Sequence, residues 1–457
     1  MENLLNSNVF QDKILLSKRF KVQGFILLFL GILSTLIPSI VFDVSKAPLI
    51  AILLYALVRI FLKRNSAAVF NLAYGVYLIS GAFFLLVTTY TFGFPFLGGG
   101  DDKFFYEAGR ALAQADMNIN TYVDGVPLWA ANYPGYLYIL AGFYKVLALM
   151  GFGQYHFFYL SLLKICIGSL IPVLVFKIFR TLPHVYSERS LWILVLFPTL
   201  VIHTVSLLRE SVISVVFLLM VYQVVKDSKP IKGLFWMLVC TALVFVVRPV
   251  HASFLVIFFL TYTFLSYPKY LAIKLGGLII VFITLSMNWV QGLSFLGSDL
   301  DRVQDAYLTL AKESNQEGSI GIKLYTSNSL LLQPVKLVYF FLSPIPPPIV
   351  ISINLLSIYI SLGIIYWYLY VFGFFAGFSN FIKRGDRLYL TTLILFLVSG
   401  IVGVVSSKDS RHLIYIYPLI IPYGYAQVQF MRKRTIKQIV YGFLAFGVMG
   451  YIILKLF

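Results

Sequence analysis

The sequence predicts an all-α, polytopic integral membrane protein, and three observations carry this prediction. The chain of 457 residues is 60% hydrophobic and only 12% charged. Apolar runs of about 17–25 residues, long enough to cross a bilayer as helices, recur along its whole length. These runs lack the alternation of lipid-facing β-strands, and helices satisfy their backbone hydrogen bonds internally. We therefore expect a bundle of about 13 transmembrane helices with further helices at the external membrane surface.

The apolar runs set the expected layout along the chain. In order, the expected spans are residues 23–42, 48–63, 69–92, 156–178, 190–207, 211–226, 232–248, 252–267, 273–290, 349–376, 388–405, 411–430 and 437–456. They are expected to form a single membrane domain over residues 1–457, with the N-terminal spans in 1–68. Two long external loops remain: a first at 93–155, which carries an acidic motif, and a second at 291–348.

The distribution of basic residues predicts the orientation of the spans. The formal net charge is +18, which by itself would be compatible with nucleic-acid binding. However, the basic residues gather in short polar breaks between apolar runs, at "KRN" (Lys63), "KIFR" (Lys177), "KDSKPIK" (Lys226), "KRGDR" (Lys383) and "RKRTIK" (Arg432). This is the positive-inside pattern of membrane proteins. It places the N-terminus in the cytoplasm and the C-terminus outside, and argues against a nucleic-acid partner.

Two apolar stretches are not counted as spans. The stretch "YPGYLYILAGFYKVLALMG" (133–151) opens with Pro-Gly and carries Lys145, and a span there would break the charge pattern that follows. We expect it to be an interfacial or re-entrant helix on the external side. The stretch "VKLVYFFLSPIPPPI" (335–349) has the same character, because its prolines cannot continue a helix.

An acidic pair follows the third apolar run, in "FLGGGDDKFFYEAGRAL". The three glycines permit tight turns, and a helix is expected to begin at Lys103. One aspartate could serve only as the helix N-cap, but that role does not account for both Asp101 and Asp102. Two adjacent carboxylates at an apolar boundary either raise the pKa of one of them or hold a cation. The pair is therefore a candidate general base, or a candidate site for a divalent cation such as Mg²⁺ or Mn²⁺.

Three further charged clusters lie at ends of expected spans. They are "HTVSLLRES" with Arg209 and Glu210, "VVRPVHAS" with Arg248 and His251, and "SSKDSRHLIYIYP" with Lys408, Arg411 and His412. Arginine suits two-point contact with phosphate oxygens, and ionisable groups between apolar runs are often functional. A local ion pair in a tight hairpin, snorkelling to the interface and a plain solvated loop are the respective alternatives.

All four clusters fall on the external face in the predicted topology. Acidic and basic side chains would then meet at one boundary between water and lipid. Such a site suits a substrate with an apolar tail in the membrane and a charged head group at its surface.

The motifs resemble those of a known enzyme family. The stretches "GGGDDKFFYEAGRAL", "NYPGYLYILAGFYKVLALMG", "FPTLVIHTVSLLRES" and "SSKDSRHLIYIYPLIIPYG" are similar to segments of the GT-C superfamily of membrane glycosyltransferases. More narrowly, they resemble bacterial relatives of the protein mannosyltransferase and lipid A aminoarabinose transferase group (family 39-like). The chain departs from this group in having only Tyr-Pro-Gly where a Pro-Pro pair is frequent, and in two extra spans before the acidic loop.

The resemblance implies a GT-C-like helical bundle in the bacterial inner membrane, with a catalytic aspartate at Asp101 or Asp102. It also implies substrate-binding positions on the external face, which here are Tyr106, Glu107, Arg110, Tyr133, Arg209, Glu210, Arg248, His251, Lys408, Arg411 and His412. The implied reaction is inverting transfer of a sugar from a polyprenyl-phosphate donor to a cell-envelope glycan, lipid or protein.

Two other functions are compatible with the same features. An envelope polysaccharide polymerase or ligase would use a lipid-pyrophosphate-linked oligosaccharide, and paired external arginines favour it. A transporter or flippase is a more distant alternative. It would place ionisable groups near mid-membrane, where only Lys164 is found within an expected span.

Overall fold

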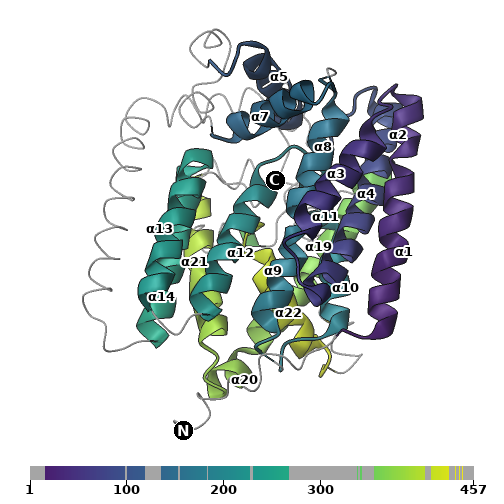
Figure 1. The fold of residues 1–457 in the computed structure, drawn as a ribbon. Helices are drawn as coiled ribbons and strands as arrows, with labels where there is room; N and C mark the ends of the chain where they lie inside the picture. Colours follow the sequence, from purple (N-terminus) through teal and green to yellow (C-terminus); the bar gives the residue numbers. More distant parts are fainter. Residues whose placement is uncertain are drawn as a thin grey trace, which may run out of the picture. The chain divides into compact units, whose positions relative to one another are not determined.

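The computed structural model describes a largely helical chain. The residues it describes are 16–97, 100–118, 135–152, 155–182, 184–226, 230–266, 337, 340–341, 355–406, 413–431, 438, 442 and 445. Within these residues every regular element is a helix, as predicted (Figure 1). The expected spans 273–290 and 437–456 and the second external loop lie outside the described residues, apart from isolated positions.

The chain divides into two units, which are described separately. Unit 1 comprises Met1–Ser228 and Ala242–Arg248. Its helices are α1 (Lys18–Ser34), α2 (Leu36–Val41), α3 (Ala47–Arg59), α4 (Arg64–Phe92), α5 (Gly100–Gln114), α7 (Gly135–Leu149), α8 (Phe157–Gly168), α9 (Leu170–Phe179), α10 (Glu188–Leu196), α11 (Pro198–Val205) and α12 (Glu210–Lys226), with the last residues of α13 (Pro230–Val247).

Unit 2 comprises Lys229–Thr241 and Pro249–Phe457. It holds the first part of α13, and α14 (Pro249–Ser266), α19 (Leu355–Ala376), α20 (Phe378–Lys383), α21 (Arg387–Ser406) and α22 (Tyr417–Val428).

Five stretches of the described chain are long and apolar enough to cross a membrane. They are Lys18–Val41, Arg64–Phe92, Phe157–Phe179, Pro249–Ser266 and Leu355–Ala376. This supports a membrane-embedded helical protein. Helices also occupy the expected spans at 48–63, 211–226, 232–248, 388–405 and 411–430, but they do not meet the same criterion of length and composition.

The expected span 190–207 is not one straight helix. α10 ends at Leu196 and α11 begins at Pro198, and the two are bent by 54°. Phe197 between them is extended, with φ −64° and ψ 113°. A residue that precedes proline is driven out of the helical region by the proline ring, which accounts for the break. Together the two helices are still long and apolar enough for one broken span, so the break changes the shape expected for this segment.

α4 is a long and largely buried helix of unit 1, and its contact with α1 depends on glycine. A Cβ atom added at Gly75 would lie 2.3 Å from the backbone carbonyl of Leu27, and one at Gly31 would lie 2.6 Å from the Gly75 carbonyl oxygen. The two backbones can approach so closely only because neither position carries a side chain. Small residues serve the same purpose at many helix interfaces in membranes.

We predict that Gly75→Ala lowers the stability of the protein, because the new methyl group must push the α1 backbone away. Overpacking of this kind costs about 1–3 kcal/mol. Gly142→Ala in α7 is the control, since the nearest atom to its added Cβ is Met117 Cε at 4.0 Å. Thermal unfolding of both variants in one detergent measures the difference. Equal midpoints for the two variants would contradict the close-contact interpretation.

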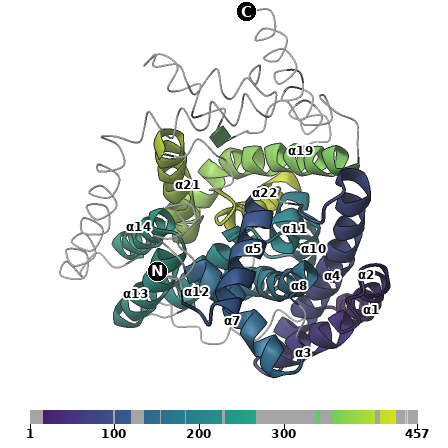
Figure 2. The same ribbon diagram turned by 90° about the horizontal axis from the view of Figure 1, so that it is seen from above.

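α5 and α7 form a helical pair at one end of unit 1. They lie across the ends of the longer helices in Figure 1, and Figure 2 shows them from above. Phe105 of α5 and Tyr136 of α7 pack edge to face with ring centroids 4.9 Å apart. The two helices are also close at Gly109 of α5: a Cβ atom added there would lie 3.1 Å from the Leu140 Cβ of α7. α7 occupies the stretch that we predicted to be an interfacial or re-entrant helix.

α8 begins at a histidine cap. His156 precedes the helix, and its Nδ1 accepts a hydrogen bond from the Phe158 N–H at 3.1 Å. An imidazole nitrogen can accept only while it is unprotonated. Burial lowers the pKa of His156 below its ordinary value, which keeps the cap in this neutral form.

We predict that the folded protein loses stability as the pH falls below about 6.5, the ordinary histidine value. The pKa of His156 is lower in the folded state than in the unfolded state, so the unfolded state gains the proton first. His156→Asn replaces the cap with one that does not titrate. Unfolding midpoints between pH 5 and 8 should therefore vary less in this variant. An unchanged pH profile would contradict the role assigned to His156.

Unit 2 is anchored by an aspartate at the start of α21. Asp386 accepts the Tyr389 N–H at 3.0 Å, as an N-cap does, and the Tyr423 hydroxyl donates to both of its oxygens at 3.0 and 3.1 Å. This joins α21 to α22. α22 also approaches α19 closely, because a Cβ at Gly424 would lie 2.1 Å from the Tyr370 carbonyl oxygen.

Candidate functional site

The acidic pair lies inside the first turn of α5. The helix begins at Gly100, so the expectation of a start at Lys103 was wrong by three residues. Asp101 and Asp102 therefore occupy the positive end of the helix dipole, where carboxylates are stabilised. Neither precedes the helix, and the alternative role of one aspartate as its N-cap does not apply.

The two aspartates have different surroundings. Asp102 has no exposed surface, and its Oδ1 accepts the Leu207 N–H at 2.9 Å. Leu207 lies 105 residues later in the chain. Asp101 is only partly buried. Asp102 is therefore suited to hold a loop in place, and Asp101 is the carboxylate that a substrate can reach.

The loop at 206–209, between α11 and α12, is held by buried side chains from three other helices. Besides the Asp102 contact from α5, the Leu207 carbonyl accepts the Tyr136 hydroxyl of α7. The Leu208 carbonyl accepts from Lys164 Nζ of α8 at 2.6 Å. Backbone groups buried in apolar surroundings need such partners. These contacts fix the position of the residues that follow, Arg209 and Glu210.

Lys164 is fully buried within the long apolar helix pair α8 and α9. Its Nζ also donates to Ser211 Oγ, and it lies 5.6 Å from the centre of the Tyr136 ring. The charges of Glu210 and Asp102 both act on it. From sequence, Lys164 was associated only with the transporter alternative. A lone lysine in an apolar run was the signal that could have placed it here.

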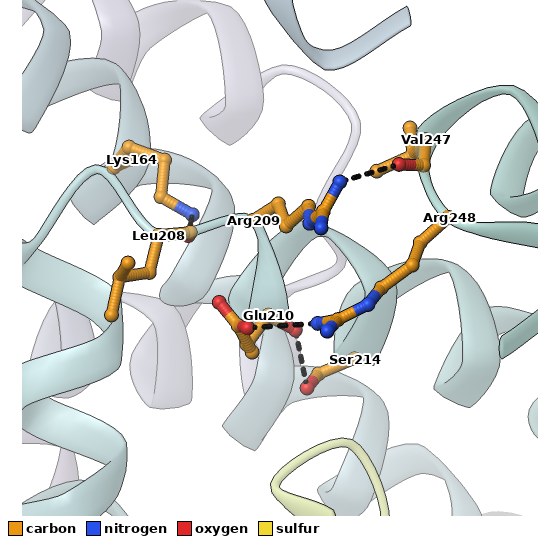
Figure 3. A network of polar contacts seen from close by, with 7 residues as sticks. All are labelled: Lys164, Leu208, Arg209, Glu210, Ser214, Val247 and Arg248. Atoms are coloured by element: carbon orange, nitrogen blue, oxygen red, sulfur yellow. Dashed lines mark hydrogen bonds and ion pairs between the residues drawn. The ribbon is translucent and has the colours of Figure 1, made fainter. Parts of the chain in front are cut away.

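The buried Glu210 and the partly buried Arg248 form an ion pair. Arg248 Nη1 lies 3.1 Å from Glu210 Oε1 (Figure 3). The Arg248 side chain is 17% exposed and the Glu210 side chain 7%. Glu210 opens α12, and its carbonyl accepts the Ser214 hydroxyl at 2.8 Å. Arg248 follows α13 directly. The pair therefore connects the start of α12 with the end of α13. The sequence analysis had assigned Glu210 and Arg248 to two separate charged clusters.

Arg209 lies between this ion pair and the acidic pair. Its Nη1 donates to the Val247 carbonyl at 3.2 Å, and its guanidinium lies 6.0 Å from the Phe105 ring centre. The charges of Arg248, Glu210 and Asp101 all act on it. Burial, and then the Arg248 charge, lower the pKa of Arg209 to about 10. The guanidinium therefore stays positive at neutral pH.

These residues define what we call the loop cluster: Asp101, Asp102, Tyr136, Lys164, Arg209, Glu210 and Arg248. Its partly exposed members are Asp101, Arg209 and Arg248, and the others lie behind them. The charge of the partly exposed Asp101 acts on Arg209, and so does the charge of Arg248. A carboxylate in such surroundings can accept a proton from a hydroxyl while the arginines hold an anion nearby. Three of the four clusters predicted from sequence contribute to it.

Three predicted residues of α5 lie further along the helix. Tyr106 donates to the Tyr155 carbonyl at 3.0 Å. Glu107 pairs at 3.9 Å with Lys103 on an exposed face. Arg110 is exposed and lies roughly 13 Å from Asp101 along the helix axis. They border the loop cluster but take no part in the contacts described above.

His251 belongs to a different setting from Arg248. It lies in α14 of unit 2, buried, with its ring 5.3 Å from Tyr415 and 5.7 Å from Phe254 between centroids. The Tyr415 hydroxyl and Ser399 Oγ are 2.5 Å apart. The remaining predicted residues, Tyr133, Lys408, Arg411 and His412, lie outside the described residues.

The loop cluster offers few ligands for a metal ion. Within the described part of the chain, no three histidine, cysteine or acidic side chains come together in a way that could hold one. Asp102 already accepts a backbone N–H. A divalent cation at the acidic pair would thus rely on Asp101 together with oxygens of a substrate, as Mg²⁺ commonly does.

Comparisons with known proteins add no relative. No protein-family model matches the chain, and neither a curated protein nor a solved structure matches it significantly. The resemblance to GT-C glycosyltransferases therefore rests on the motifs quoted above.

We predict strong coupling between Glu210 and Arg248. Arg248→Met leaves the buried Glu210 carboxylate without its ion-pair partner, which costs about 3–5 kcal/mol. The double variant with Glu210→Gln should cost clearly less than the sum of the single variants. Unfolding midpoints of the purified wild-type protein, the two single variants and the double variant complete this double-mutant cycle. The exposed pair Lys145 and Asp116, at 2.5 Å, is the comparison and should show little coupling. Additive effects at Glu210 and Arg248 would refute the prediction.

Proposed function

We propose that the protein is a membrane glycosyltransferase that transfers a sugar from a polyprenyl-phosphate donor to a cell-envelope acceptor. The observation that carries the proposal is the loop cluster at one end of unit 1, in which the charges of the partly exposed Asp101 and of Arg248 both act on Arg209. Arginine can hold the phosphate of the donor, and a carboxylate can remove a proton from the acceptor. The quoted motifs give the same assignment by resemblance.

The reaction assigns a role to each charged group. Asp101 takes the proton from the acceptor hydroxyl. The acceptor oxygen forms a bond with the anomeric carbon as the bond from that carbon to the phosphate oxygen breaks, so the configuration inverts. The phosphate leaves with the electron pair, and Arg209 and Arg248 stabilise its growing negative charge. Asp102 and Lys164 act indirectly, because they hold the loop that carries Arg209.

The proposed orientation follows the basic residues of the sequence. The loop cluster would face the outside of a bacterial inner membrane, and the basic breaks would face the cytoplasm. The acceptor would be a glycan, a lipid-linked saccharide or a protein hydroxyl at that surface.

The test is transfer of radiolabelled sugar from polyprenyl-phosphate donors by purified protein in lipid. Asp101→Asn should abolish transfer in protein that still shows a cooperative unfolding transition, since an amide cannot serve as the base. Asp102→Asn should lower the midpoint, because the new amide weakens the contact with the Leu207 N–H. Asp116→Asn is the matched control: this exposed acid has φ 51°, which asparagine tolerates. Full transfer by Asp101→Asn would remove Asp101 as the base.

A polymerase or ligase that uses a lipid-pyrophosphate-linked oligosaccharide is the second candidate. It is favoured by the proximity of the Arg209 and Arg248 charges, which suits a pyrophosphate. The same protein should then bind that donor and show no transfer from polyprenyl monophosphates. Arg209→Gln should abolish this binding. Transfer from the monophosphate donor would decide against this candidate.

A further inference from the structure

A second charged cluster lies in unit 1, at the far end of α12 from the loop cluster. α12 carries Glu210 at its start and Lys226 at its end, which are roughly 25 Å apart for a helix of this length. The charges of Lys226, Arg180 and Lys63 all act on Lys177, which lies at the end of α9. Arg180 follows α9 directly, and Lys63 precedes the first residue of α4. We call these four residues the basic cluster. None of the contacts of the proposed reaction involves it.

Two members of the basic cluster contact the same aromatic ring. The Nζ atoms of Lys177 and Lys226 each lie 5.5 Å from the centre of the same Tyr222 ring. Lys177 is repelled by Arg180, Lys226 and Lys63, in decreasing order. The Arg180 Nε is buried and has no hydrogen-bond partner among the described residues. The basic cluster thus contains an N–H donor that forms no hydrogen bond within the described part of unit 1.

The surroundings compensate only part of this charge. The C-terminal ends of α9 and α12 each contribute roughly half a negative charge, about one in total against four cations. α4 begins beside Lys63 and adds roughly half a positive charge. Its first turn contains no acidic residue, and no side chain caps it. No acidic residue in the described chain pairs with any of the four cations, and Asp227, the next residue after Lys226, lies outside it.

This end of unit 1 is also a boundary of an apolar span. Lys177 lies in the last turn of Phe157–Phe179, and Arg180 follows it. Cations at such a position meet the head groups of lipids, and basic pockets between transmembrane helices bind anionic head groups. A helix N-terminus with uncapped N–H groups suits the same phosphate oxygens.

We infer that the basic cluster is a binding site for a phosphate group, supplied by the head group of an anionic phospholipid. The phosphate would neutralise the repulsion among Lys177, Arg180 and Lys226 and accept from the Arg180 Nε. A ligand that binds only the folded state raises its stability. The site is separate from the loop cluster, so the inference does not depend on the proposed glycosyl transfer.

The test compares unfolding midpoints of the full-length protein in nanodiscs of two compositions. One is phosphatidylcholine alone, and the other contains added phosphatidylglycerol. The midpoint of the wild-type protein should rise with phosphatidylglycerol. The rise should be lost in the triple variant Lys177→Gln, Arg180→Gln, Lys226→Gln. Lys18→Gln, Arg19→Gln, Lys21→Gln removes the same charge from α1 and should retain the rise.

Two further measurements make the outcome decisive. Inorganic phosphate added to phosphatidylcholine nanodiscs, at matched ionic strength, tests a free phosphate as the source; a rise there and none with phosphatidylglycerol would replace the lipid by a soluble ligand. If the triple variant does not fold, the single variant Lys226→Gln takes its place, because Lys226 is exposed. This single variant should reduce the rise in the midpoint with phosphatidylglycerol. A rise that the control variant loses equally, or no rise with either phosphate source, would overturn the inference.

Discussion

The organisation of unit 1 depends on how a short buried loop satisfies its backbone. Residues 206–209 join α11 to α12, and 206–208 are buried, so their N–H and C=O groups need partners within the protein. An aspartate, a tyrosine and a lysine from three separate helices supply the missing partners. Each of these side chains is itself polar and buried, so burying it is favourable only while its backbone partner in the loop is present. Loop and helices therefore define one another's positions.

The same constraint explains why charges of opposite sign lie so close together. An isolated ion in these surroundings is costly, and a paired one is tolerable only with further hydrogen bonds. Glu210 meets Arg248, and Arg209 reaches the Val247 carbonyl and the Phe105 ring. The cluster is thus stabilised internally, while Asp101 and the edges of both guanidinium groups remain accessible. Such a division between supporting and accessible groups is what a preorganised site requires.

Much of this arrangement could be predicted from the sequence, because helix type and charge placement are local properties. Long apolar runs correctly indicated helices. Of the four charged clusters that were expected to meet, residues of three interact in unit 1, and the fourth lies outside the described residues. Pro198 signalled the break at Phe197, but the prediction gave more weight to the uninterrupted apolar run on either side of it. The contact of Asp102 with Leu207 could not be predicted, since it spans 105 residues and no spacing rule reaches so far. Lys164 was noticed, but its partners were not, for the same reason.

The burial of Lys164 also constrains how the chain is made. A lysine at the centre of a transmembrane helix costs about 2.5–3.5 kcal/mol to insert. Its backbone acceptor, the carbonyl of Leu208, lies 44 residues further along the chain. Chains fold from the N-terminus during synthesis. The helix that carries Lys164 therefore reaches the membrane before the segment that carries its acceptor, and it reaches its final state only when that segment has docked beside it.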